Sequence, residues 1–93
     1  GIKVMETSGD LALLLAIVSS IKNKPLPHDL VAFGEIGLSG EIRPVPGGQE
    51  RLREAAKHGF KKAIVPKANA PHKPIKGLEV ITADRLQDAL ANL

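Results

Sequence analysis

Residues 29–59 constrain the fold of this chain more than any other stretch. Residues 30–36 are largely apolar, as expected for a strand that is covered on both faces. Gly37 and Gly40 then supply a tight turn, and residues 41–43 alternate polar and apolar side chains. This pattern predicts a β-hairpin at the start of the stretch.

The second half of the same stretch predicts a corner and a helix. Pro44 and Pro46 end the second strand of the hairpin because proline donates no hydrogen bond to a sheet ladder. Residues 49–58 then have the narrow apolar stripe of a helix that lies on a protein surface. Gly59 and Phe60 are expected to end this helix, since glycine adopts the left-handed conformation and the apolar residue packs back on the last turn.

The chain before this stretch predicts one strand and one helix. Residues 2–5 have strand character, and residues 11–21 are apolar at nearly every position. Ser8 and Asp10 suit the start of that helix, where a side-chain oxygen accepts from free backbone N–H groups and an acid faces the positive end of the dipole. Because a helix that is apolar all round is normally buried, we expect residues 11–21 to form the central helix of the core.

The chain after it predicts two further strands and a closing helix. Residues 61–65 and 78–81 are short apolar strands, separated by a loop at 67–77 that contains two prolines and has little to bury. The closing helix is expected to begin at Thr82 or Ala83. The order β-α-β-β-α-β-β-α indicates an α/β (α+β) domain with one mixed sheet packed against helices. The apolar face of the closing helix consists of Leu86, Ala89, Leu90 and Leu93.

Composition limits the chemistry that this chain can perform. Its 93 residues are enough for one domain, and the absence of cysteine excludes a thiol nucleophile and a thiolate metal site. Two phenylalanines without tryptophan or tyrosine leave few aromatic rings on which nucleic-acid bases could stack. No apolar run approaches a membrane span, so we expect a cytoplasmic protein with no membrane partner. Because the chain starts without methionine, in a predicted strand, we expect a fragment of a longer protein.

Charge is segregated along the sequence. Residues 51–77 hold eight lysines and arginines against one acid, for a net charge of +7, whereas the remaining residues have a net charge of −4. A segregated positive segment suggests a polyanionic partner, although a solvated lysine-rich surface would have the same composition.

Other candidate side chains give weaker signals. His28, His58 and His72 are dispersed and lack the spacing of metal ligands. His58 is better placed near a helix C-terminus, where its charged form is favoured. Glu35 and Glu41 flank the hairpin turn and form a possible acid–base pair, but no cleft is evident from the sequence.

Residues 34–45, GEIGLSGEIRPV, resemble the G-E-[IV]-x-L-x-G-x-[IV]-x-P-[IV] segment of the Lon protease proteolytic domain. The likeness continues without gaps through residues 59–66, GFKKAIVP, and within this superfamily it is strongest to the C-terminal Lon-like domain of a family of bacterial DNA-repair ATPases. The resemblance covers essentially residues 1–93, which it identifies as a Lon-like domain without its first strands. It implies a Lon proteolytic-domain-like fold, the fold of the second domain of a small-subunit ribosomal protein. The remaining segments that resemble this family are ETSGDLALLLAIVSS, PLPHDLVAFGEIGLSGEIRPVP, GQERLREAAKHGF and AIVPKANAP.

The same resemblance implies that this chain lacks the catalytic activity of the Lon family. Lon peptidases use a serine nucleophile that a lysine activates. The serine position falls on Ser8, where the family's Asp-Gly-Pro-Ser-Ala-Gly motif is otherwise lost, and the lysine position falls on Arg51. Arginine has a pKa far above the neutral range and therefore cannot take up the proton of the serine. A frame shifted to align the paired glycines puts Leu52 there, and the nearest lysine, Lys57, lies roughly 9 Å along the helix from Arg51. A residual serine peptidase with Ser8 as nucleophile stays the alternative.

The resemblance also implies partners. Lon-like domains form six-membered rings, and in the DNA-repair family such a ring would lie beside an ATPase ring and contact DNA during repair and recombination. ATP, magnesium and zinc are expected only in an upstream ATPase core and zinc finger, so this segment is expected to hold no cofactor or metal. Besides DNA binding and residual peptidase activity, a purely structural role in ring formation is a third hypothesis. Sequence-independent phosphate contacts are expected from Lys61, Lys62, Lys67, Lys73 and Lys76.

Overall fold

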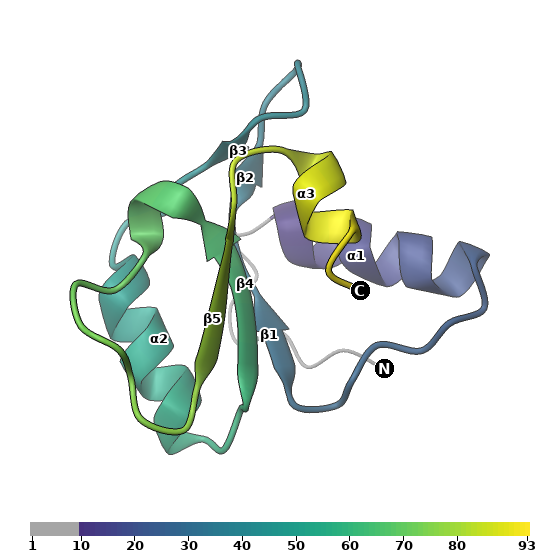
Figure 1. Cartoon of the computed structure of the whole chain (residues 1–93). Coiled ribbons are helices and arrows are strands. Elements are labelled where there is room, and N and C mark those ends of the chain that lie inside the picture. The colour runs from purple at the N-terminus through teal and green to yellow at the C-terminus, as the bar shows by residue number, and fades with distance from the viewer. Residues whose placement is uncertain (1–9) are drawn as a thin grey trace.

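The computed structural model describes residues 10–93, which form helices on both sides of a small sheet (Figure 1). The predicted strand at residues 2–5 and the position of Ser8 lie outside the described residues. The elements in chain order are α1 (Asp10–Ile21), β1 (Leu30–Ala32), β2 (Glu35–Ile36), β3 (Ile42–Arg43), α2 (Gly48–Lys57), β4 (Lys62–Pro66), the 3₁₀ turn η1 (Lys67–Asn69), β5 (Glu79–Ala83) and α3 (Leu86–Leu90).

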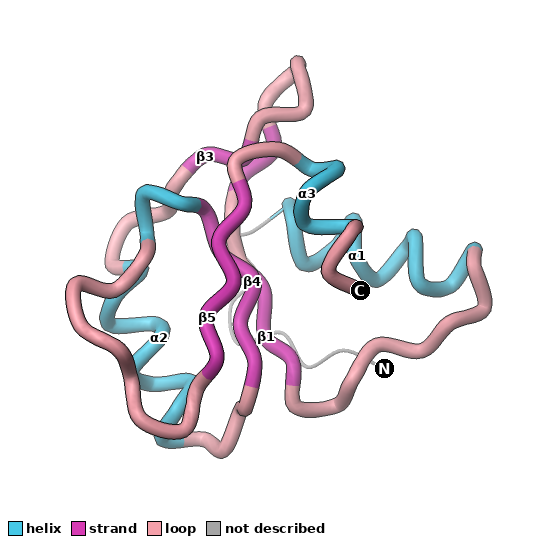
Figure 2. Tube along the Cα trace, in the orientation of Figure 1, coloured by secondary structure: helices cyan, strands magenta, loops and turns pink. Residues whose placement is uncertain are grey.

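The strands run both parallel and antiparallel, which confirms an α/β domain with mixed strand directions. Within residues 10–93, however, they form two sheets, so the prediction of one sheet is wrong for the described part. The larger sheet is parallel and has the order β1-β4-β5 (Figure 2). The smaller sheet is the antiparallel hairpin of β2 and β3, in the place where the sequence predicted a hairpin.

Gly34 divides the predicted strand 30–36 into β1 and β2. Its φ of 145° is one that residues with a side chain rarely adopt. A Cβ atom at this position would lie 2.9 Å from Cγ2 of Ile42 and 3.1 Å from Cγ of Pro66. The carbonyl of Gly34 accepts a hydrogen bond of 3.0 Å from the N–H of Leu11, near the start of α1. The close approach of two other segments therefore explains why the strand bends at this glycine.

Successive side chains along the strands point to opposite faces of the parallel sheet and contribute to two apolar clusters, one on each face. On β1, Leu30 and Ala32 join the cluster under α1 and α3, whereas Val31 joins the cluster under α2. On β4, Ile64 belongs to the first cluster, and its neighbours Ala63 and Val65 belong to the second. Figure 1 shows this layering, with α2 on one side of the sheet and α1 with α3 on the other.

Helix α1 is not buried all round, contrary to the prediction. Leu11, Ala12 and Leu15 are fully buried against the sheet. In contrast, Leu13 is 62% exposed and Ile21 is 77% exposed. The apolar composition of the helix concealed this difference because α1 packs on the sheet through one face, and no described element covers its outer face.

The two other helices agree better with the sequence. Helix α2 ends as predicted, since Phe60 donates from its N–H to the carbonyl of Ala55 at 3.1 Å and its side chain is buried. Helix α3 begins at Leu86 rather than at Thr82 or Ala83, because β5 extends to Ala83 alongside β4.

One buried amide joins the corner after β3 to the turn after β4. The side-chain oxygen of Asn69 accepts from the N–H of Val45 at 2.8 Å, and its NH₂ group donates to the carbonyl of Val45 at 3.0 Å. Asn69 is the buried polar residue of the described part, with 8% of its surface exposed. A Cβ atom on Gly48 would lie 2.3 Å from Nδ2 of Asn69, so the amide fits only above a glycine.

We predict that Asn69→Ala lowers the free energy of unfolding by about 2–4 kcal/mol, because both backbone groups of buried Val45 would lose their partner. Asn92→Ala serves as the control, since Asn92 is exposed and its amide makes a single bond to the carbonyl of Asp88. That variant should stay within roughly 0.5 kcal/mol of the parent in urea unfolding. Equal losses in the two variants would contradict the structural role assigned to Asn69.

Candidate functional site

The structure describes the positions considered for the catalytic base, Arg51, Leu52 and Lys57, which all lie on α2. Ser8 lies outside residues 10–93, so the geometry of a Ser8–Arg51 pair stays untested. Arg51 is half-buried in the first turns of α2, and Leu52, the alternative position, is a fully buried core residue. Lys57 is exposed at the far end of the same helix.

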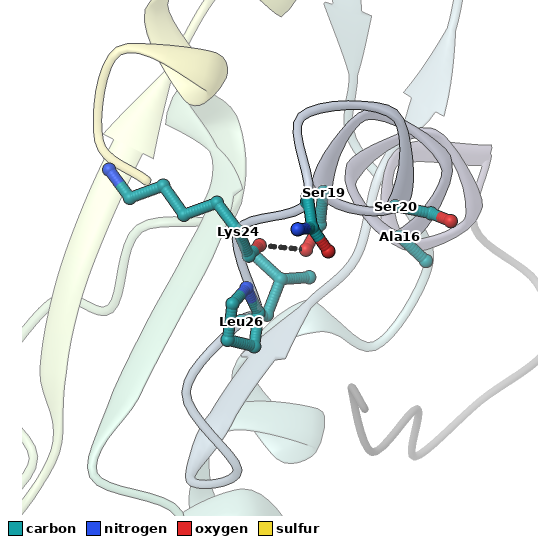
Figure 3. A pocket seen from close by; sticks show the side chains of 7 residues that line it. Ala16, Ser19, Ser20, Lys24 and Leu26 are labelled. Carbon is teal, nitrogen blue, oxygen red and sulfur yellow. Dashed lines mark hydrogen bonds between the residues drawn. The ribbon is translucent and has the colours of Figure 1, made fainter.

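A second serine–lysine neighbourhood lies in an open pocket at the C-terminal end of α1. The pocket has a volume of about 410 Å³ and includes Ser19, Ser20 and Lys24 in its lining. The hydroxyl of Ser19 donates to the backbone carbonyl of Lys24 (Figure 3). The ammonium group of Lys24 extends away and lies 3.4 Å from the carbonyl of Leu93. The two functional groups therefore do not form a nucleophile and base.

The lysines proposed to contact phosphate come from different parts of the fold. Lys61 and Lys67 lie before and after β4 and are therefore separated by roughly 20 Å of extended chain. Lys62 directs its ammonium group to the carbonyl of Asn92 at 3.4 Å, on the side of the sheet that α1 and α3 cover. Lys67 lies 4.0 Å from the carboxylate of Asp84.

A more compact group of cations lies between α2 and the loop before β5. Arg53 projects from α2, and His72 and Lys73 come from the loop; together with Gln49 they line a cleft of about 310 Å³. We call these four residues the basic cleft. Neither Arg53 nor Lys73 forms an ion pair within residues 10–93, so both cations stay available to an external anion.

Sequence reasoning selected only Lys73 from the basic cleft. Arg53 and His72 are about twenty positions apart, and no local pattern indicates that the loop folds back along α2. Lys76, in the same loop, is exposed but does not line the cleft. The +7 segment was the single signal that pointed to this region.

The carboxylates beside the hairpin turn have structural partners. Glu41 accepts from the N–H of Ser39 at 3.0 Å and from the guanidinium group of Arg43 at 2.9 Å. The hydrogen bond from Arg43 is the main cause that lowers the pKa of Glu41 below its ordinary value of 4.5. Glu35 lies opposite Arg43 in the hairpin register. Glu41 therefore stabilises the turn and is not poised as a proton donor.

The histidines are separate from one another. His28 and His72 are exposed, and the ring of His58 lies 3.3 Å from the carboxylate of Glu54, one turn earlier in α2. Within residues 10–93, no three histidine, cysteine or carboxylate side chains are grouped closely enough to hold a metal ion. The same part of the chain contains no helix of the length and apolarity needed to cross a membrane.

Comparison with known proteins places this chain in a family. Residues 2–69 match the family described as subunit ChlI of Mg-chelatase. The chain belongs to this family. The chain is 64% identical over 91 residues to "DNA repair protein RadA" of Escherichia coli (strain K12), an alignment that covers 98% of this chain and 20% of that protein.

Other relatives of this ChlI-family chain have the same name. The identity is 66% over 91 residues to the RadA of Salmonella typhimurium, covering 98% of this chain and 20% of that protein. It is 48% over 90 residues to the RadA of Aquifex aeolicus, covering 97% of this chain and 20% of that protein. The chain thus spans about a fifth of the length of the curated relatives it matches. These identities confirm the predicted resemblance to a bacterial DNA-repair protein.

We predict that the side chain of Glu41 titrates below 4.5 in a carboxyl NMR titration, and that Arg43→Ala raises its midpoint towards that value. A lowered pKa in the folded state means that this carboxylate contributes stability above its unfolded pKa, and the contribution is lost as the pH falls through the folded pKa. Arg53→Ala is the matched control and should leave the midpoint unchanged. A Glu41 midpoint insensitive to Arg43 would refute the assigned cause.

Proposed function

We propose that this chain is a non-catalytic, Lon-like module of a RadA-type DNA-repair and recombination protein, acting in ring assembly and in sequence-independent DNA binding. The observation that carries the proposal is the identity of 64–66% along nearly the whole chain to proteins named "DNA repair protein RadA". We further propose a Lon proteolytic-domain-like fold, on the motif of residues 34–45, and a cytoplasmic location.

DNA contact in this proposal is made through phosphates. The basic cleft places Arg53 and Lys73, which form no ion pair within residues 10–93, in one concave surface. Lys76 and Lys61 are exposed near the amino ends of β5 and β4. Phosphate contacts of this kind do not read base sequence and weaken as salt rises. The small number of aromatic residues favours contact with the backbone over base stacking.

Peptidase activity is not part of the proposal. A guanidinium group, as at Arg51, does not serve as a general base, and the alternative position, Leu52, has no basic group. ATP, magnesium and zinc are assigned in this proposal to parts of RadA-type proteins outside this segment.

We predict that the variant Arg53→Ala/Lys73→Ala binds duplex DNA more weakly than the parent. The slope of log affinity against log salt concentration should become shallower by about 1.8, because two phosphate contacts are lost at roughly 0.9 each. Lys57→Ala removes an exposed cation at the far end of α2, outside the lining of the cleft, and is the control. If the double variant keeps the parent slope, the basic cleft does not contact DNA.

We also predict that the chain does not cleave casein, and that Ser8→Ala leaves this result unchanged. Measurable cleavage that disappears in the Ser8→Ala variant would instead establish the residual serine peptidase.

A further inference from the structure

Strand β5 forms an open edge of the parallel sheet. Within residues 10–93 it pairs with β4 on one side and with no strand on the other. Figure 1 shows β5 in front of β4, with no described segment drawn across it. An open edge presents backbone N–H and C=O groups that another strand can bind. What this edge binds depends on which of these groups face outward and on the side chains beside them.

The outward backbone groups of β5 belong to Val80 and Thr82. The N–H of Glu79 donates to the carbonyl of Lys61 at 2.9 Å, on the β4 side. In a parallel ladder, residues that bond to the neighbouring strand alternate with residues that face away from it, so Ile81 also bonds to β4. Within residues 10–93, no other segment forms a backbone hydrogen bond with Val80 or Thr82. These two residues therefore offer two donors and two acceptors to a further strand.

The loop of residues 70–75 lies beside this edge without pairing with it. Pro71 and Pro74 have no N–H group, so neither can donate to a carbonyl of β5. The two rings also restrict the backbone of the loop, and the N–H of Leu78 donates to the carbonyl of Ile75 at 3.2 Å, just before β5. A loop restricted in this way needs little further ordering when a partner binds beside it.

A groove of about 280 Å³ separates this loop from β5. Val80 and Thr82 line it from the strand, on the face of the sheet that α2 covers. Alternate side chains of a strand added to β5 would point to this same face and enter the groove. In strand addition, backbone bonds give affinity and pockets for alternate side chains give specificity. We call this hollow the edge groove; its remaining lining is Ala70, Pro71, Pro74, Ile75 and Leu78.

Positive charge lies next to the edge groove. The groove adjoins the basic cleft, since the two hollows share three lining residues of the loop. In the basic cleft, Arg53 and Lys73 are exposed and form no ion pair within residues 10–93. Lys76, later in the same loop, is exposed as well. These cations favour a partner with acidic side chains.

The acidic side chains in this region do not reverse that preference. Glu79 points to the opposite face of the sheet from the groove, because successive side chains alternate along a strand. Asp84, which follows β5, lies 4.0 Å from the ammonium group of Lys67. On α2, Glu50 and Glu54 line neither the groove nor the cleft.

We propose that β5 binds an extended segment of another protein as an added strand, with apolar side chains in the edge groove and acidic side chains towards Arg53 and Lys73. A peptide suits this surface better than a nucleic acid does, because the groove is apolar and the outward groups of β5 have the spacing of a peptide backbone. This contact is separate from the proposed DNA contact and does not require it. Where both occur, peptide and DNA compete for the same two cations.

Fluorescence anisotropy of a labelled peptide mixed with the 93-residue chain tests this contact. The peptide alternates valine and threonine and is flanked by aspartates at both ends. We expect saturable binding, about tenfold weaker when lysines replace the aspartates. Two further peptides have methyl groups on one or the other alternate set of backbone nitrogens. One set should abolish binding and the other should not, because only one set faces β5 in an added strand.

Variants of the chain test the same edge from the other side. Thr82→Pro removes one outward N–H and keeps the pairing with β4, since proline is tolerated where the N–H of an edge strand faces outward. It should weaken binding about 3- to 10-fold, as expected for the loss of one hydrogen bond. Thr82→Val keeps the N–H and the branched shape, and should bind like the parent. Circular dichroism establishes that each variant is folded; should Thr82→Pro fail this check, the methylated peptides decide.

Amide hydrogen exchange gives a readout that does not depend on any variant. The N–H of Thr82 should exchange more slowly once the peptide is bound, whereas the N–H of Ile81 is already protected by its bond to β4. Unchanged exchange at Thr82, or equal binding of the two methylated peptides, would overturn the strand addition. A chain that binds duplex DNA but no peptide would overturn this contact alone. A chain that binds the peptide as expected but no DNA would support it and overturn only the proposed DNA contact.

Discussion

Strand β4 is the constraint on which both layers of this domain depend. It is the centre of the parallel sheet, with β1 on one edge and β5 on the other, so its backbone is paired on both sides. Both of its faces are covered, because Ile64 packs under α1 and α3 while Ala63 and Val65 pack under α2. All three side chains are fully buried. A polar substitution at any of them would place an unpaired group in the interior, at a cost that neither layer can relieve.

Features with a local cause could be predicted from the sequence. The turn glycines produced the hairpin at the expected place, and Gly59 with Phe60 ended α2 through bonds that span only a few residues. Features that depend on distant contacts could not. The break at Gly34 results from the approach of Ile42 and Pro66, and the exposed face of α1 depends on which elements surround that helix.

For the candidate site, too, the local features could be predicted from the sequence and the spatial arrangement could not. A positive charge of +7 in residues 51–77 was visible in the sequence, but its distribution in space was not. Lys62 lies on the α3 side of the sheet, whereas Lys73 and Arg53 line one cleft on the α2 side. The loop that brings Lys73 to α2 connects two parallel strands and contains only the short 3₁₀ turn η1, so no periodicity in the sequence could indicate its path. Arg51 could be assessed without any structure, because the chemistry of a guanidinium group excludes it as a base.

The contact between Gly48 and Asn69 has a consequence for how this sequence can vary. The amide of Asn69 occupies the space that a side chain at position 48 would need, and it does so while holding both backbone groups of Val45. An alanine at 48 is therefore tolerable only with a smaller residue at 69, and that residue would leave Val45 without its partner. The two positions, twenty-one residues apart, are coupled, because a substitution at one of them requires a substitution at the other. Across divergent relatives, they should be retained together or exchanged together, along with a different means of closing the corner after β3.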